Sequence, residues 1–177
     1  ELNYANAKRN PLAQTRKWKF EATSFTDDDA VNPVIEPGTR RNDCGQITDG
    51  AATLVLASEE FAAAHARRIG VALGEIPRIV GWGHRNAGLR FKDKIARSQT
   101  SEVVFPHVKQ TVDDAMRRAG LGGARDLHVI ETHDCFSVTE YMAIDHFGIT
   151  RPGESWKAVE DGTIAPGGTL PINPSGG

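Results

Sequence analysis

The sequence predicts a layered α/β fold, of the α-β-α type, with mixed sheets and helices between them. Short apolar runs, typical of buried strands, alternate along the 177-residue chain with longer segments of helical periodicity. This order implies parallel strands joined by right-handed helical crossovers. The expected elements are strands near 52–57, 77–82 and 126–131 and helices near 59–69, 101–119 and 137–147.

The first strand and helix are predicted from a change in composition after Ala51. Thr53-Leu54-Val55-Leu56 is short and apolar, as a buried strand requires. Ser58-Glu59-Glu60 then opens an Ala-rich helix that ends near Gly70. The next strand is expected from Arg78 to Trp82, and the polar segment that follows it, from His84 to Gln99, is expected to be a loop.

The helix over 101–119 has the clearest pattern, because apolar residues recur at steps of three and four and Gly120 follows as a stop. Its apolar positions are Val104, Val108, Val112, Ala115 and Ala119. Leu127 to Glu131 is then expected as a strand. A helix from Val138 to Phe147 should follow, with Tyr141, Ile144 and Phe147 facing inward.

Both ends of the chain are expected to be irregular. Residues 1–45 contain several prolines and an acidic run and lack sustained periodicity. Residues 162–177 are rich in glycine and proline, with a short strand expected around Leu170-Pro171-Ile172 before a turn. Because the chain starts without Met and stops within a glycine-rich turn, we expect it to be an internal piece of a longer protein.

Composition excludes several classes of function. The formal net charge is −2 with both signs mixed, so no basic stripe indicates nucleic-acid binding. No apolar run approaches the roughly 18 residues of a membrane span. Cys44 and Cys135 are too few for a disulfide scaffold, which favours reduced thiols in an intracellular protein. Neither the cysteines nor the six histidines show metal-ligand spacing, so no metal is expected.

The segment from Glu131 to Ser137 is the main candidate for chemistry, because it lies where a predicted parallel strand gives way to a helix. Ser137 with Glu140 three residues later predicts a capping box. Cys135 would then precede a helix N-terminus, whose partial positive charge favours a thiolate. A thiol in this position can transfer protons near neutral pH.

Each residue of this segment also has a structural interpretation. A lone cysteine is commonly a small buried apolar residue, but the strand end, the helix start and the neighbouring His133 favour a functional Cys135. His133 is equally compatible with either role. Asp134 is interpreted as a turn residue that accepts local N–H groups. From these residues alone a cysteine hydrolase is an open possibility, although no third, orienting residue is evident.

Two segments together resemble the sterol-carrier-protein-type thiolases: Ile130-Glu131-Thr132-His133-Asp134-Cys135-Phe136-Ser137, and Pro171 to Gly177 with its Asn-Pro-Ser-Gly-Gly. Residues 43–52 are similar to the segment that leads into the last strand of the family's N-terminal half. The resemblance implies a thiolase fold in three parts. Residues 1–45 would end the loop domain, 46–73 would be the last strand and helix of the N-terminal half, and 74–177 would begin the C-terminal half.

The resemblance also implies roles for individual residues. Cys135 would be the acid/base, and His133, in place of the Asn that most thiolases have there, would line an oxyanion hole. Substrate-binding positions would be Phe136, Asn173, Ser175 and Gly176. The family's nucleophilic Cys and its Gly-His-Pro His have no counterpart here, and Cys44 is interpreted as structural. The chain by itself is therefore expected to be inactive.

The function implied is that of an acetyl-CoA C-acyltransferase, which cleaves 3-ketoacyl-CoA thiolytically, or runs the reverse Claisen condensation, in fatty-acyl or steroid side-chain metabolism. Alternatives are a thiolase-like aldolase subunit acting on a β-hydroxyacyl-CoA, and a non-catalytic lipid-carrier or assembly subunit with the same fold. Acyl-CoA and coenzyme A are expected as substrates, with no further cofactor. A homo-oligomer, dimer or tetramer, is expected, in the bacterial cytoplasm or a eukaryotic peroxisome.

Overall fold

The computed structural model describes residues 1–176 and is mainly helical. Its α-helices are α1 (Leu2–Arg9), α2 (Glu59–Ile69), α3 (Phe91–Gln99), α4 (Pro106–Ala119), α5 (Ser137–Phe147) and α6 (Ser155–Glu160). Short 3₁₀ helices are η1 (Gln14–Lys17), η2 (Ala22–Phe25), η3 (Arg41–Asp43), η4 (Leu73–Glu75) and η5 (Ala124–Asp126). Strands β1 (Val34–Glu36) and β2 (Thr39–Arg40) pair antiparallel.

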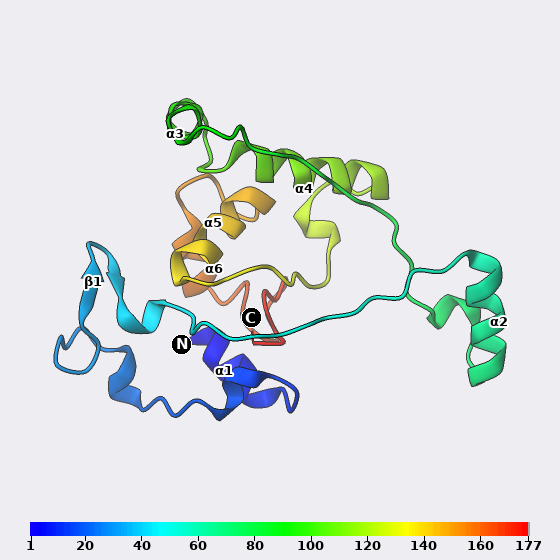
Figure 1. Cartoon of the computed structure of the whole chain (residues 1–177), viewed down its shortest axis with the longest axis horizontal. Helices are drawn as coiled ribbons and strands as arrows, with labels where there is room; N and C mark the ends of the chain where they lie inside the picture. The colour runs from blue at the N-terminus through cyan, green and yellow to red at the C-terminus, as the bar shows by residue number, and fades with distance from the viewer. Residues whose placement is uncertain (177) are drawn as a thin grey trace.

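The core lies between α5, α6 and the last stretch of the chain. Ile144, Ile164 and Ile172 are completely or almost completely buried in it, together with Ile130 and Leu170. Burying a side chain of this size contributes about 1.5–3 kcal/mol. Figure 1 shows α4, α5 and α6 gathered around this region, whereas α2 stands apart at the end of two extended stretches of chain.

Two of the three predicted helices are confirmed with their bounds. In α2 the Ser58 hydroxyl accepts a hydrogen bond from the Phe61 N–H (3.3 Å), and Gly70 ends the helix in the left-handed conformation. The helix expected over 101–119 begins only at Pro106. Proline suits the first turn of a helix, where its missing N–H is not needed, and disfavours a helical residue before it.

The predicted strands at 52–57 and 77–82 do not form within residues 1–176. Both segments are extended but unpaired, and Leu54 and Val55 are 86% and 84% exposed. A β-strand needs backbone hydrogen bonds to a neighbouring strand, and none joins these two segments to any other described segment. The third predicted strand, 126–131, is reduced to an isolated parallel bridge between Ile130 and Ile172, and its first residue, Asp126, ends η5. That bridge is also all that forms of the strand expected around Leu170.

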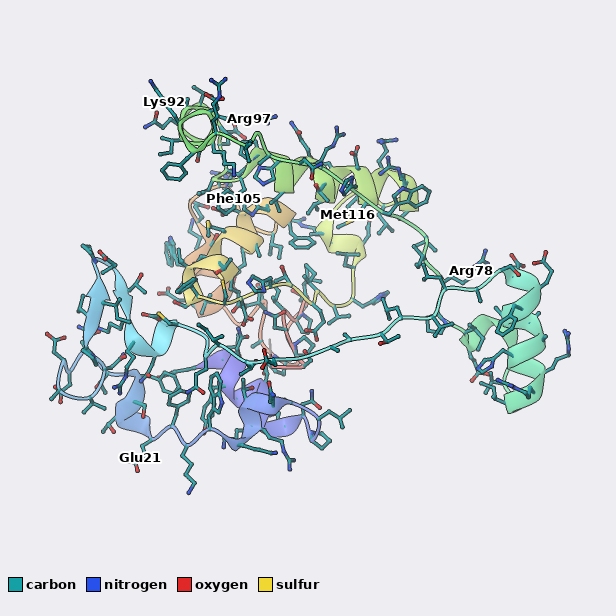
Figure 2. The ribbon with its side chains drawn as sticks, viewed as in Figure 1. Glu21, Arg78, Lys92, Arg97, Phe105 and Met116 are labelled. Carbon is teal, nitrogen blue, oxygen red and sulfur yellow. The ribbon has the colours of Figure 1, made fainter. Side chains whose placement is uncertain are left out.

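The segment that contains Trp82 lies along α4 (Figure 2, with Arg78 labelled on the stretch that leads to it). A Cβ on Gly81 would collide with the Ala115 carbonyl oxygen, and one on Gly83 with the Thr111 carbonyl oxygen. Between these glycines, the Arg118 guanidinium lies 5.1 Å from the Trp82 ring centroid and donates to the Trp82 carbonyl. The Gly-Trp-Gly order thus allows the backbone to contact the helix directly.

Several elements lie in segments expected to be irregular. The predicted loop after His84 contains α3, and residues 1–45 contain α1 and the β1–β2 hairpin. Helix α6 lies before the irregular segment 162–177 and was not predicted at all. The pattern of α1 is hard to detect because one of its two buried residues is the polar Asn6. The domain boundaries after residues 45 and 73 stay predictions. Among the described residues, none of the helices combines the length and apolar character of a membrane span.

Candidate functional site

The turn from Glu131 to Phe136 joins the Ile130 bridge to α5 and is held from a distant part of the chain. Cys44 and Phe136 form an isolated antiparallel bridge, and the Gly45 N–H donates to the Cys135 carbonyl at 2.7 Å. A Cβ on Gly45 would lie 3.1 Å from that carbonyl oxygen, a tight contact. Cys44 itself is half-buried, and its thiol lies 3.6 Å from the Arg40 carbonyl. Segment 43–45 therefore supports the turn.

The start of α5 differs from the predicted capping box. The hydroxyl that accepts the Phe136 N–H belongs to Thr139 (3.2 Å). Ser137 is already the first helical residue, and its hydroxyl donates to the Asp43 carboxylate at 2.8 Å. Glu140 turns toward α1 instead of toward the helix N-terminus. The helix begins two residues after Cys135, with Phe136 as its N-cap, so Cys135 precedes the positive end of α5 in the chain.

Cys135 and His133, the predicted catalytic residues, occupy alternate positions of this turn. The Cys135 side chain is half-buried, with its sulfur 3.8 Å from the Thr139 hydroxyl oxygen. The His133 side chain is exposed. Phe136, predicted to contact substrate, is 45% exposed. The turn thus presents these three side chains where a ligand can reach them.

The second predicted motif, Asn173 to Gly176, lies directly against this turn. Asn173 is fully buried, and its side-chain oxygen accepts the Thr132 N–H at 2.8 Å. The Asn173 N–H donates to the Ile130 carbonyl (2.8 Å). Ser175 donates from its N–H (3.0 Å) and its hydroxyl (2.6 Å) to the two carboxylate oxygens of Glu131. Two segments about forty residues apart therefore form one structural unit.

Helix α1 covers the same unit from the other side. The Asn6 amide donates to the Asn173 carbonyl at 3.0 Å, and both side chains are buried. Gly176, with φ +107°, brings its Cα so close to the helix that an added Cβ would lie 2.6 Å from the Ala7 Cα and Cβ. Of the predicted substrate-binding residues, Asn173 and Gly176 are thus buried under α1, whereas Phe136 and Ser175 are exposed.

Three polar residues that the sequence did not indicate as a site meet at the same place. The Asn3 amide of α1 donates to the carboxylates of Asp134 and Glu140. Burial raises the pKa of both carboxyl groups. Asp134 was interpreted as a local turn residue; its partner is instead 131 positions away. In the sequence, the only sign that Asp134 belongs to the site is its position within the turn.

These groups line a cavity of about 730 Å³ between α1, η3 and α5. Its polar lining includes Asn3, Asp134, Glu140 and Ser137, and its apolar lining includes Tyr4 and the neighbouring aromatic rings. In residues 1–176 no three His, Cys, Asp or Glu side chains are grouped as metal ligands would be. The arrangement offers a thiol, an imidazole and partly buried carboxyl groups around one turn, which suits proton transfer and hydrogen bonding to a substrate oxygen.

The fold and this turn define a thiolase-type protein. Residues 90–177 match the family model described as "Thiolase C-terminal domain-like", and this part of the chain belongs to that family. The expected resemblance to sterol-carrier-protein-type thiolases is confirmed by relatives that align with nearly the whole chain.

Among those relatives, Sterol carrier protein 2 of Bos taurus is 32% identical over 99% of this chain and 30% of its own length. Acetyl-CoA acetyltransferase of Methanothermobacter thermautotrophicus is 28% identical over 99% of this chain and 41% of its own. Benzoylsuccinyl-CoA thiolase subunit BbsB of Thauera aromatica is 26% identical, with the same coverage. The chain therefore spans well under half the length of these relatives.

A solved structure shares the fold. The "Ltp2-ChsH2(DUF35) aldolase" superposes with a TM-score of 0.65 over 99% of this chain and 43% of its own, at 19% identity. Together with the family match, this confirms the predicted α/β thiolase-type fold class. The unpaired segments at 52–57 and 77–82 lie within that matched fold.

Proposed function

We propose that the protein to which this chain belongs is a thiolase-type acyltransferase that cleaves a 3-ketoacyl-CoA with coenzyme A, or runs the reverse condensation. The observation that carries the proposal is the packing of the His133 to Phe136 turn against Asn173 to Ser175, in a chain similar along its length to an acetyl-CoA acetyltransferase. Acyl-CoA and coenzyme A are the proposed ligands, and no other cofactor is needed for this chemistry.

In the proposed reaction, a nucleophilic cysteine outside this chain takes the acyl group as a thioester. The bond between the α- and β-carbons breaks, and its electron pair leaves on the departing acetyl-CoA as an enolate. The Cys135 thiol gives its proton to the α-carbon of this enolate and later recovers a proton from the incoming coenzyme A thiol. His133 donates a hydrogen bond to the thioester oxygen, where negative charge develops.

The position of Cys135 supports an acid/base role. Cys135 precedes Ser137, the first residue of α5, by two positions, and its half-buried sulfur lies 3.8 Å from the Thr139 hydroxyl oxygen. A thiol is a weak acid that can give up and recover a proton, and the proposed reaction requires both steps. His133 lies two residues earlier in the same turn and is exposed, so its imidazole is accessible to a ligand at the turn.

The test is acyl trapping in the full-length protein. Cys135→Ala should lower the turnover of acetoacetyl-CoA with coenzyme A by roughly 10²–10⁴-fold, the usual contribution of a positioned proton donor. Cys135→Ser should restore little of it, because a hydroxyl is far less acidic than a thiol. Mass spectrometry after incubation with acyl-CoA should locate the acyl adduct on a cysteine outside this chain. An adduct on Cys135 would make it the nucleophile and refute the assignment.

A second candidate is an aldolase that cleaves a β-hydroxyacyl-CoA. It is favoured by one observation, the shared fold with the aldolase chain. The two reactions differ in what they require. Thiolysis consumes free coenzyme A and passes through an acyl-enzyme, whereas aldol cleavage needs neither. Release of an aldehyde or ketone from a β-hydroxyacyl-CoA without added coenzyme A, and without an acyl adduct, would select the aldolase. Absence of both activities would select a non-catalytic lipid-carrier or assembly subunit.

A further inference from the structure

Two partly buried carboxyl groups share one hydrogen-bond donor beside the turn from Glu131 to Phe136. The Asn3 Nδ2 donates to Asp134 Oδ2 and to Glu140 Oε2, the latter at 2.7 Å. Because both oxygens lie within one hydrogen bond of the same nitrogen, the two carboxyl groups are close neighbours. Two negative charges at such a separation, in a partly buried site, strongly oppose each other's ionisation.

No side-chain cation pairs with the two carboxyl groups within residues 1–176. The Glu1 α-amino group lowers the pKa of Glu140 and His133 lowers that of Asp134, but burial has the larger effect on both. Neither carboxyl group takes part in an ion pair there. The Lys8 ammonium of α1 is used by the carbonyls of Arg16 and Trp18. The other titratable groups on the surrounding elements are Glu1, Tyr4, Asp43, Cys44, Glu131, His133, Cys135 and Tyr141. Of these, Asp43 and Glu131 are already hydrogen-bonded to serines, and His133 alone can add a positive side-chain charge.

The unpaired hydrogen-bonding atoms of the site also favour a protonated carboxyl group. Three side-chain oxygens here are buried acceptors without a donor: Glu140 Oε1, Asn3 Oδ1 and Asn6 Oδ1. A protonated carboxyl group converts one acceptor into a donor. The Asn173 amide nitrogen is a buried donor without an acceptor within hydrogen-bond distance. It faces Asp134 and lowers the pKa of that carboxyl group, which partly offsets the effect of burial. One ionised and one protonated carboxyl group satisfy these groups better than two carboxylates do.

We propose that Asp134 and Glu140 form a carboxyl pair that holds a single proton at neutral pH and, bridged by Asn3, fixes the turn that carries His133 and Cys135. Both are positioning residues, and this role rests on the proposed function of that turn. Asp134 stands between His133 and Cys135 in the chain, so its tether to α1 and α5 sets the direction of both side chains. Loss of the shared proton would place two charges on the pair and loosen the turn.

The first test is independent of turnover. Infrared difference spectra of the full-length protein titrated between acidic and alkaline pH should show the C=O band of a protonated carboxylic acid that persists at pH 7. Isotope labelling of Asp or Glu assigns it, and Glu140→Gln should remove it. Glu160→Gln, at an exposed carboxylate of α6, is the matched control and should leave the band in place. Absence of the band at pH 7 in the unmodified protein would overturn the shared proton, whether or not the protein is a thiolase.

The second test concerns positioning. Glu140→Ala removes the carboxyl group and should lower the proposed turnover by about tenfold to a hundredfold, as expected when catalytic groups are displaced by fractions of an ångström to an ångström. Glu140→Gln keeps the shape and the neutral charge of the protonated group, so it should recover most of that loss. Glu140→Gln should also shift the alkaline limb of the pH profile of turnover. If Gln and Ala are equally impaired and their pH profiles match that of the unmodified protein, the pair does not position the turn.

These tests separate the two hypotheses. The infrared band reports the shared proton even in a protein that fails to cleave 3-ketoacyl-CoA, which would refute only the proposed function. A protein active as a thiolase, but without the band, would refute only the pair.

Discussion

The close contact between Gly176 and α1 gives a sharp prediction, because a single methyl group should separate the helix from the turn. In Gly176→Ala the added Cβ would lie 2.6 Å from the Ala7 Cα and Cβ and 2.9 Å from the Ala7 backbone nitrogen. Ordinary contacts between carbon atoms begin near 3.5 Å, so helix and turn must separate by about 1 Å. Residue 176 would also have to keep a φ of +107°, which L residues rarely adopt.

The expected loss of stability follows from both effects. Overpacking costs about 1–3 kcal/mol and unfavourable backbone conformation about 1–3 kcal/mol, so Gly176→Ala should lose roughly 2–6 kcal/mol of unfolding free energy. Moving α1 also withdraws Asn3 from Asp134 and Glu140. The double variant Ala7→Gly with Gly176→Ala should recover only part of the loss, because the Ala7 Cα and nitrogen remain in the way.

Urea unfolding of the full-length protein, followed by circular dichroism, measures this effect. Gly88→Ala is the matched control, since a Cβ there has no heavy atom within 4 Å and φ is not positive. It should change the unfolding free energy by less than about 1 kcal/mol. If Gly176→Ala were as stable as Gly88→Ala, the packing of α1 on this turn would be refuted.

Two further predictions concern other parts of the fold. Burial lowers the pKa of His146, whose Nε2 accepts the Phe105 N–H at 3.1 Å at the start of α4 (Phe105 is labelled in Figure 2). The folded protein therefore binds this proton less readily than the unfolded chain, so stability should fall as pH drops below about 6.5, the pKa of an unfolded histidine. In His146→Gln this acid loss should be smaller; equal pH dependence in urea titrations would contradict the assignment. Gly83→Ala should displace the Trp82 segment from α4 and lose about 1–3 kcal/mol, and a stability matching that of Gly88→Ala would refute the close approach.

The sequence predicted those elements whose signals are local. The helices at 59–69 and 137–147 have their bounds set by neighbouring residues: a serine cap and a glycine stop for α2, and the stop at Gly148 for α5. The start of the helix over 101–119 was predicted five residues too early, because the apolar period continues through Val104. The helix begins at Pro106, whose ring disfavours a helical residue before it. Periodicity describes which face is apolar and says less about where the helix begins.

The strands failed for the opposite reason, since a strand is a property of two segments. Leu54 and Val55 have the composition of a buried strand, yet they are exposed because no described segment pairs with them. The same limit applies to the site. The turn and the Asn-Pro-Ser-Gly-Gly segment were identified from their motifs, but Asn3 lies 131 residues from Asp134. Nothing in the local sequence around Asn3 distinguishes it from an exposed amide.

The contacts of the turn indicate why its cysteine is suited to chemistry. The turn is fixed by its backbone and by other residues: Gly45 binds the Cys135 carbonyl, Ser175 binds Glu131, and Asn3 binds Asp134. The Cys135 sulfur has, among the described residues, only a long contact to the Thr139 hydroxyl. Cys135→Ala should therefore lower the unfolding free energy by no more than about 1 kcal/mol while turnover falls by the large factor given above. A variant that lost stability and turnover together would show that the thiol holds the turn in place, and the acid/base assignment would lose its main physical support.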